Sequence, residues 1–309
     1  MTDYLLTLGG LVALVIGAEL MIRGSVDLAL RARISPLVVG LTIVSIGTSA
    51  PELLVSLFAA AKGSSSIAIG NVVGSNIINI SFILGLSILV FPLEVDREAK
   101  RIHWPVVMIV SVLFWWLVQD DAFARWEGAV FIALLVGYVG WMIVSSRRGS
   151  KERARVPATM PIWKALVLLV VGVTGLAKGA EWFVDGASAI ASTMGVSEQL
   201  IGVTVVAVGT SLPELVTSMI AAFRKQPDIS LGNLLGSNVF NILGILGVTA
   251  VLKPIPVDHV AFRSDLQIML ASVLLLYPLM RFTDKLGRWQ GAVLVVFYAG
   301  YIALVLHRG

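Results

Sequence analysis

Two glutamates, Glu52 and Glu214, lie inside apolar stretches long enough to cross a membrane. An ionisable side chain at membrane depth costs about 2.5–3.5 kcal/mol on insertion scales, so such residues usually serve function. Each glutamate belongs to a short motif, GTSAPEL in one case and GTSLPEL in the other. The motifs also supply hydroxyl groups one turn away, on Thr48, Ser49, Thr210 and Ser211. Carboxylates and hydroxyls are hard oxygen donors, which favour Na⁺, Mg²⁺ or Ca²⁺ over Zn²⁺ or Cu²⁺.

A proline precedes each glutamate, at Pro51 and Pro213. Proline removes a backbone donor and leaves a carbonyl on the preceding turn without its partner. Such carbonyls can bind a cation where unwound backbone lines a cavity in the membrane. A second duplicated motif, GNVVGSNIIN and GNLLGSNVFN, adds hydroxyl and amide oxygens four residues apart on one face of a helix. These groups belong to Ser75, Asn79, Ser237 and Asn241.

The predicted ligands indicate both an ion and a mechanism. Flexible oxygen ligation by about 6–8 donors suits Ca²⁺ better than Mg²⁺, which requires a near-ideal octahedron. Two carboxylates balance one Ca²⁺, a small group of Na⁺ ions, or protons. An empty centre would carry a charge of about −2 in a low dielectric, which is costly to move. We therefore expect only occupied states to switch, so that ions competing for Glu52 and Glu214 are exchanged obligatorily.

The motifs belong to an internal repeat. Residues 42–96 align with residues 204–258 at a constant offset of 162, and 25 of the 55 positions are identical. The match continues outward, since RWEGAV at 125–130 recurs as RWQGAV at 288–293. Each half holds five apolar segments, so the two copies enter the membrane upside down relative to each other. Inverted repeats of this kind are typical of secondary transporters.

The composition is that of an integral membrane protein. The chain has 309 residues, of which 57% are hydrophobic and 14% charged, and it has no cysteine. These values exclude a soluble enzyme, a disulfide scaffold and a thiolate metal site. We predict an all-α integral membrane protein with ten transmembrane helices in two inverted five-helix repeats, at 1–145 and 160–309, joined by a linker at 146–159. The predicted spans are about 4–22, 36–61, 66–91, 104–119, 126–145, 161–183, 198–223, 229–252, 265–280 and 289–306.

The basic residues predict an orientation. Fifteen Lys and Arg residues follow the odd-numbered spans, and five lie on the other side. Because cytoplasmic loops collect basic residues, both termini should lie outside the inner (plasma) membrane and the 146–159 linker in the cytoplasm. The net charge of +4 follows from this topology rather than from nucleic-acid binding. We expect the lipid bilayer and small inorganic cations as partners, a monomer, and no cofactor.

The duplicated motifs resemble the two alpha repeats of the sodium/calcium exchanger family, within the calcium/cation antiporter superfamily. The resemblance covers essentially the whole chain. It implies a core of eight helices crossed by two long tilted helices, the first and the sixth, which slide during switching. It also implies one central Ca²⁺ site overlapped by several Na⁺ sites. The residues that the resemblance assigns to these sites are Glu52, Glu214, Thr48, Ser49, Thr210, Ser211, Ser75 and Ser237, with the backbone carbonyls of Ser45 and Ala207.

One position departs from the family pattern. Well-known exchangers carry an aspartate where this chain has Asn241, and Asn79 is likewise an amide. An amide neither takes up a proton nor adds negative charge, so the counter-ion stays open between Na⁺ and H⁺. We favour a Ca²⁺/Na⁺ antiporter, not an enzyme, with H⁺/Ca²⁺ antiport as the alternative. An ion channel would show unitary currents, and intramembrane proteases use pairs of aspartates.

Other residues are assigned structural roles. Glu19 and Glu181 are related by the repeat, and we place them towards the ends of the first and sixth spans, where salt bridges form at the interface. His103 is expected in a loop. Gly172 and Gly179 indicate close helix packing.

Overall fold

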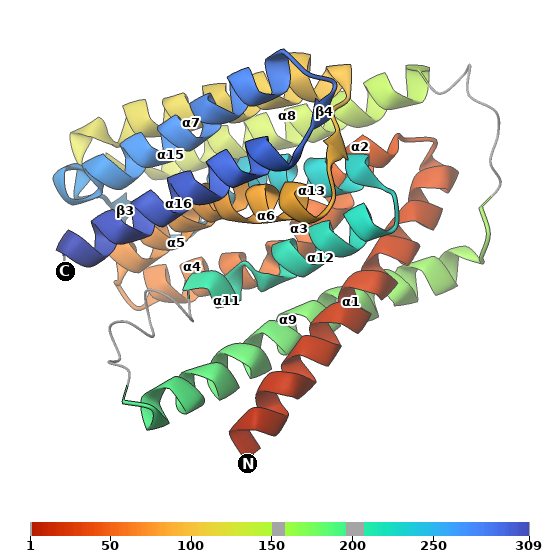
Figure 1. The fold of residues 1–309 in the computed structure, drawn as a ribbon. Helices are drawn as coiled ribbons and strands as arrows, with labels where there is room; N and C mark the ends of the chain where they lie inside the picture. Colours follow the sequence, from red (N-terminus) through yellow and green to blue (C-terminus); the bar gives the residue numbers. More distant parts are fainter. Residues whose placement is uncertain (1, 150–157, 196–206, 309) are drawn as a thin grey trace.

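The computed structural model describes residues 2–149, 158–195 and 207–308, most of which are helical (Figure 1). Eight helices in this part of the chain are long and apolar enough to cross a membrane. A ninth span is bent by 46° between Thr48 and Ala50. The short apolar helix α12 (Leu212–Phe223) belongs to the seventh predicted span, 198–223, whose residues 198–206 lie outside the described part of the chain. The predicted all-α architecture of ten spans is confirmed.

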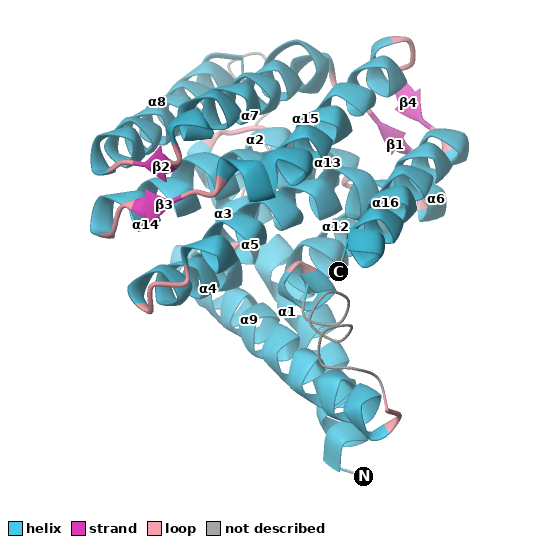
Figure 2. Ribbon diagram, turned by 90° about the vertical axis from the view of Figure 1, so that its left-hand side faces the viewer, coloured by secondary structure: helices cyan, strands magenta, loops and turns pink. Residues whose placement is uncertain are grey.

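Two long helices, α1 (Thr2–Ala32) and α9 (Ile162–Thr193), cross each other beside the main bundle (Figures 1 and 2). Both continue about ten residues beyond the predicted spans. In α1 the extra turns carry charged residues that pair along the helix, since Arg23 bonds Glu19 at 2.5 Å and Arg31 bonds Asp27 at 2.9 Å. Ion pairs between residues four apart stabilise a helix, so α1 extends beyond the end that the apolar pattern alone predicts.

Glycines allow α1 and α9 to approach closely. Gly10, Gly17 and Gly24 recur every seven residues on α1; Gly10 packs against Gly179 of α9, Gly17 against Gly172, and Gly24 against the backbone of Ala165 and Leu169. A Cβ added to Gly17 would lie 2.7 Å from the backbone nitrogen of Leu176, and one added to Gly172 would lie 2.5 Å from that of Met21. The close packing predicted for Gly172 and Gly179 is confirmed.

The remaining elements form the bundle. In the first half these are α2 (Pro36–Val39), η1 (Gly40–Val44), α3 (Ser45–Thr48), α4 (Ala50–Ala61), α5 (Ser65–Ile77), η2 (Ile78–Ile83), α6 (Leu84–Val90), η3 (Ala99–His103), α7 (Trp104–Leu117), η4 (Val118–Asp120) and α8 (Arg125–Gly149). In the second half they are α11 (Ala207–Thr210), α12, α13 (Pro227–Val239), η7 (Phe240–Leu246), α14 (Gly247–Leu252), α15 (His259–Arg281) and α16 (Arg288–Arg308).

The two spans that run through η2 and η7 form the centre of the bundle. In their most apolar windows 78% and 83% of residues are buried, against 17–33% in the other uninterrupted spans. Both carry the GN–GSN motif, so the fold places these polar side chains where lipid does not reach them.

Two short sheets connect the halves. Strand β1 (Leu93–Glu94) pairs with β4 (Lys285–Leu286), and β2 (Ala122–Phe123) pairs with β3 (Ile255–Pro256), both antiparallel. Leu93 faces Leu286 in one sheet, and their repeat counterparts Ile255 and Phe123 face each other in the second. In Figure 1 β3 and β4 lie at opposite ends of the bundle. The same pairing thus occurs once at each end, as inverted repeats require.

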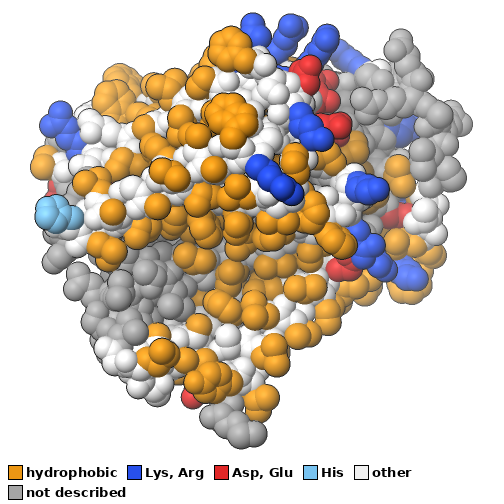
Figure 3. Space-filling model, in the orientation of Figure 1, with side chains coloured by type: hydrophobic (Ala, Val, Ile, Leu, Met, Phe, Trp, Pro, Cys, Tyr) orange, Lys and Arg blue, Asp and Glu red, His pale blue; other side chains and the backbone are white. Residues whose placement is uncertain are grey.

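Charged and apolar side chains are separated on the surface. In Figure 3 hydrophobic side chains cover the middle of the visible face, while most of its Lys and Arg gather towards the end that carries β4. Trp126, Trp163 and Trp289 are each 64% exposed near the beginnings of their helices, as expected of an aromatic belt at a membrane interface. The molecule is a multi-pass membrane protein with one strongly basic end.

The sequence predicted the wrong positions for two sets of residues. His103 is not in a loop: it is the last residue of η3, 2% exposed, with its Nδ1 2.7 Å from the Tyr138 hydroxyl. Glu19 and Glu181 lie well inside their helices, because α1 and α9 are longer than predicted. Their role in salt bridges is confirmed: Glu19 pairs with Arg23 and Arg224, and Glu181 with Lys178.

Candidate cation-binding site

Two helix breaks place the glutamates. Ser49, between α3 and α4, has φ −84° and ψ 9°, and Ser211, between α11 and α12, has φ −93° and ψ 8°. A proline in the first turn of each new helix prevents the preceding helix from continuing. Glu52 and Glu214 consequently lie in the first turns of α4 and α12, where the helix dipole favours negative charge.

The two breaks meet in the middle of the bundle. The Ser49 hydroxyl donates to Glu214 Oε1 at 2.8 Å, which joins the first motif to the second. The Ser237 hydroxyl lies 3.5 Å from the same oxygen. Glu52 and Glu214 are 1% and 0% exposed, and their carboxyl groups are close enough to interact electrostatically. The structure therefore brings together the two glutamates that the sequence predicted as partners.

The amides Asn79 and Asn241 lie in the π-helical segments η2 and η7. Such wide turns occur frequently at functional sites. Among the described residues, neither polar atom of the Asn79 side chain has a hydrogen-bond partner. Asn241 Nδ2 donates to Asn76 Oδ1 at 3.1 Å, while its own Oδ1 is unpaired within the same part of the chain. Each amide thus keeps a free oxygen in the core.

Several buried oxygens in this centre lack a partner. Native structures pair nearly all buried polar groups, so a group of unpaired oxygens indicates a missing ligand. None of the ion pairs in the described chain involves Glu52 or Glu214. A bound cation would supply both the missing contacts and the missing positive charge. In the described residues the unpaired oxygens are Oε1 and Oε2 of Glu52, Oε2 of Glu214, Oδ1 of Asn79, Oδ1 of Asn241 and Oγ of Ser211.

Sequence reasoning missed two amides that hold the glutamate helices. Asn71 Nδ2 donates to the Glu52 carbonyl at 3.1 Å and to the Ser56 hydroxyl at 2.9 Å. Its repeat counterpart Asn233 makes the equivalent bonds to the Glu214 carbonyl at 3.5 Å and to the Ser218 hydroxyl at 3.0 Å. The signal was present in the sequence, since these residues are the first asparagines of the duplicated GN–GSN motif.

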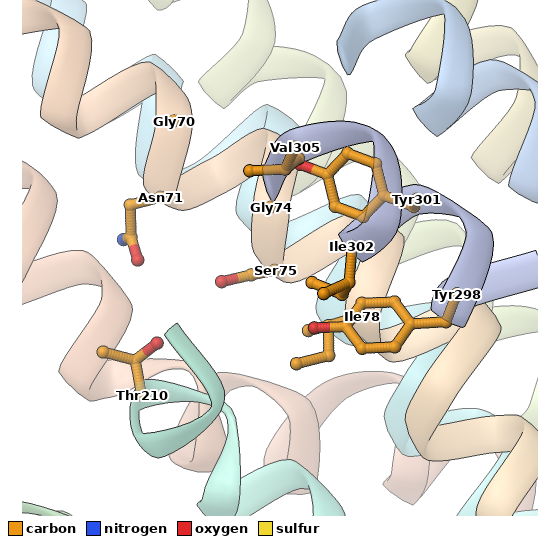
Figure 4. A pocket seen from close by; sticks show the side chains of 10 residues that line it. All are labelled: Gly70, Asn71, Gly74, Ser75, Ile78, Thr210, Tyr298, Tyr301, Ile302 and Val305. Carbon is orange, nitrogen blue, oxygen red and sulfur yellow. The ribbon is translucent and has the colours of Figure 1, made fainter. Parts of the chain in front are cut away.

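Two sets of polar side chains that the repeat relates, each drawn from both halves, are arranged differently. Thr48 Oγ1 lies 3.1 Å from Asn233 Oδ1 and 3.5 Å from the Ser237 hydroxyl, so these three side chains are drawn together. Their repeat counterparts Thr210, Asn71 and Ser75 instead line a cavity of about 160 Å³. In Figure 4 these three side chains point towards its open middle, with Tyr298 and Tyr301 of α16 on one side.

The two predicted backbone ligands begin short helices. Ser45 is the first residue of α3, and its carbonyl accepts the Ser49 N–H at 3.0 Å and the Thr48 hydroxyl at 3.2 Å. Ala207 is the first residue of α11, directly after the segment 196–206 that lies outside the described residues. Both assignments stay predictions.

Comparison with known proteins identifies the family. The family model described as sodium/calcium exchanger protein matches residues 2–144 and 164–307. The sodium/calcium exchanger MaX1 of Methanosarcina acetivorans is 29% identical over 345 aligned positions, which cover 99% of each chain. The inner membrane protein YrbG of Escherichia coli is 32% identical over 311 positions, covering 96% of this chain and 94% of its own.

A solved structure agrees with these matches. The structure of the sodium-calcium exchanger NCX_Mj soaked with 2.5 mM Na⁺ and 0.1 mM Ca²⁺ superposes with a TM-score of 0.85 at 34% identity, covering 98% of each chain. Fold, duplicated motifs and buried carboxylates thus agree with sequence matches over both halves. The chain belongs to the sodium/calcium exchanger protein family, whose members are membrane antiporters of Ca²⁺ and another cation.

Proposed function

We propose that this chain exchanges Ca²⁺ for Na⁺ across the membrane at a central site built on Glu52 and Glu214. The observation that carries the proposal is the pair of fully buried carboxylates with unpaired oxygens and, among the described residues, no basic partner. Hard, flexible oxygen ligation suits Ca²⁺ and Na⁺. No cofactor is needed for such exchange, and the ions themselves are the substrates.

The surrounding oxygens complete the proposed site. Glu52 and Glu214 supply the charge, and neutral oxygens fill the remaining coordination positions. Na⁺ and Ca²⁺ would then compete for the same carboxylates, which couples the exit of one ion to the entry of the other. The proposed neutral ligands are Thr48, Ser49, Ser75, Asn79, Thr210, Ser211, Ser237 and Asn241, with the carbonyls of Ser45 and Ala207.

The unequal halves support alternating access. Thr48 of the first half contacts Asn233 and Ser237 of the second, while the equivalent set, Thr210 of the second half with Asn71 and Ser75 of the first, surrounds a cavity. This cavity lies against the C-terminal part of α16, at the end of the bundle that carries β3 (Figure 1). If the closed set of side chains opened and the open set closed, the site would be accessible from the β4 end instead. With both termini outside and the 146–159 linker in the cytoplasm, the observed arrangement faces outward.

Calcium uptake into proteoliposomes tests the proposal. An outward Na⁺ gradient at constant pH should drive ⁴⁵Ca²⁺ uptake, and Glu52→Gln and Glu214→Gln should each lower it by about 100-fold or more, because each leaves the centre short of one charge. Glu94→Gln, a change at an exposed strand residue, is the matched control and should transport normally. Uptake that survives in both centre variants would overturn the site.

The same vesicles distinguish Na⁺ from H⁺ as the counter-ion. With two central amides where a further carboxylate would bind protons, we expect a pH gradient at constant Na⁺ to drive no uptake. Uptake driven by the pH gradient alone would replace Na⁺ by H⁺ in the proposal and leave the glutamate site intact.

A further inference from the structure

A second cavity lies far from the glutamates, at the basic end of the molecule. It measures about 530 Å³ and opens between the beginning of the α7 span and the end of α15. Its lining includes four basic residues and two aromatic ones, namely Arg97, Lys100, Arg101, Arg281, Trp104 and Tyr277. Nothing in the exchange of cations requires a positively charged pocket at this place.

The pocket carries excess positive charge. Four basic residues face a single carboxylate, Asp284. Lys100 Nζ bonds Asp284 Oδ1 at 2.9 Å, and this bond holds the pKa of Asp284 below its usual range, so the carboxylate is ionised at neutral pH. In the described part of the chain, no ion pair involves Arg97, Arg101 or Arg281. Arg97 interacts with Asp284 electrostatically at longer range, and the guanidinium groups of Arg101 and Arg281 are available to an anion.

An aromatic pair forms one wall. The rings of Trp104 and Tyr277 lie 4.4 Å apart between centroids, and the Trp104 indole N–H donates to the Val273 carbonyl at 2.8 Å. Trp104 is thereby fixed across the two helices. Next to Arg281, the side chain of Phe282 is 86% exposed, as suits an aromatic residue that enters the interfacial layer of a bilayer.

The internal repeat shows that the fold does not require this pocket. At the other end of the bundle the equivalent positions are mostly apolar, and two of them, Phe114 and Val118, are fully buried. Of the four basic residues, Arg101 corresponds to Arg263 and Arg97 to His259, while the other two correspond to apolar residues. The repeat counterparts of Lys100, Trp104, Tyr277 and Arg281 are, in that order, Phe262, Leu266, Phe114 and Val118.

We propose that this pocket binds the phosphate head group of an anionic glycerophospholipid. Guanidinium groups bind phosphate through paired hydrogen bonds, and basic pockets between transmembrane helices recognise lipid head groups. The acyl chains would lie along the outer faces of the two helices, where Ile109 and Leu274 are exposed. These apolar faces and Phe282 favour a lipid over a free phosphate ion.

Native mass spectrometry of the purified full chain tests the proposal without measuring transport. Dioleoyl-phosphatidylglycerol should stay bound at concentrations at which dioleoyl-phosphatidylcholine does not. The triple variant Arg97→Gln, Arg101→Gln and Arg281→Gln should weaken phosphatidylglycerol binding by about tenfold or more. The control variant carries Arg125→Gln, Lys253→Gln and Arg263→Gln, the same charge change at the other end, and should bind like the parent chain.

Three results would overturn the proposal. Equal retention of phosphatidylglycerol by the triple variant and the control would show that the pocket does not bind the lipid. Equal retention of phosphatidylcholine and phosphatidylglycerol would remove the role of charge. Displacement of phosphatidylglycerol by inorganic phosphate at equal concentration would make this a site for soluble anions. Because each variant is checked for an unchanged monomer peak and melting temperature, weak binding by a misfolded chain is recognised as such.

Discussion

At the scale of single residues, the centre depends on amides as much as on carboxylates. Asn71 and Asn233 each bond the backbone of a glutamate turn, and within the described parts of the chain Asn233 also accepts a hydrogen bond from Thr48 of the opposite half, which Asn71 does not match. The two positions share one sequence motif and one set of local bonds. Substituting each of them in turn therefore separates the stability contributed by the local hydrogen bonds from that contributed by the contact between the halves.

Asn233→Ala is expected to destabilise the protein more than Asn71→Ala, by about 1 kcal/mol, because it also removes one of the two acceptors that face the Thr48 hydroxyl. Each substitution alone should cost about 1–3 kcal/mol, since it leaves a buried serine hydroxyl unpaired. Denaturant unfolding in detergent measures the difference. Equal losses in the two variants would show that the Thr48 contact contributes nothing.

At the scale of elements, α1 and α9 contact each other through glycines and contact the bundle through charge. Glu19 of α1 bonds Arg224, the residue that follows α12, at 2.6 and 3.1 Å. Its repeat counterpart Glu181 bonds Lys178 of its own helix at 2.6 Å. The long helices are thus fastened to the bundle by an ion pair in one half that the other half lacks in the described residues.

Gly17→Val should weaken the packing of α1 on α9, because a Cβ at this position would lie 2.7 Å from backbone. We expect a loss of about 1–3 kcal/mol, typical of overpacking. Gly9→Val is the matched control on the same helix, since a Cβ there would meet nothing within 4 Å. Thermal melting of the two purified variants compares them. A Gly17→Val protein as stable as the control would refute close packing at this crossing.

Arg224→Gln should favour the opposite access state by about 1.4- to fivefold, since exposed ion pairs contribute about 0.2–1 kcal/mol. The chain has no cysteine, so a single Ile302→Cys in the cavity reports access through its rate of labelling by a thiol reagent. Labelling should slow in Arg224→Gln and recover when Glu19 and Arg224 exchange identities. An unchanged rate would show that the pair does not bias the equilibrium.

The sequence was sufficient for some elements and insufficient for others, for physical reasons. Apolar length and the duplicated motifs located the spans and both glutamates, because burial in lipid imposes composition directly. The ends of α1 were missed because paired charges such as Arg31 and Asp27 extend a helix beyond its apolar part. The contact between Ser49 and Glu214 joins residues 165 positions apart, and the π-helical turns around Asn79 depend on packing rather than on local propensity.

At the scale of the whole molecule, the ends differ in charge while the halves repeat in fold. The β4 end carries the basic pocket, and at the β3 end Lys100 and Arg281 have the apolar counterparts Phe262 and Val118. We expect this charge difference to set the orientation of the protein in the membrane, because loops rich in Lys and Arg are retained in the cytoplasm. An inverted repeat by itself would have no preferred orientation, so the asymmetric charges must supply it.

Single cysteines at the two sheets test this orientation. Ala122→Cys, in β2, should react with a membrane-impermeant thiol reagent in intact cells, whereas Lys285→Cys, in β4, should react only after permeabilisation. Both positions are exposed in the structure, so access of the reagent depends on the membrane alone. The reverse pattern would place the termini in the cytoplasm and turn the proposed outward-facing cavity inward.

The glycine crossing has a mechanical consequence. Glycines recur every seven residues on both α1 and α9, so matching positions are about 10 Å apart along each axis. Any smaller slip of one helix along the other would press side chains against backbone. At the linker end, Asp27 of α1 also accepts the backbone N–H groups of Thr159 and Met160, just before α9, at 2.6 and 3.2 Å. The crossing and these bonds therefore join α1 and α9 into one unit, and we expect any movement relative to the bundle to involve both helices together.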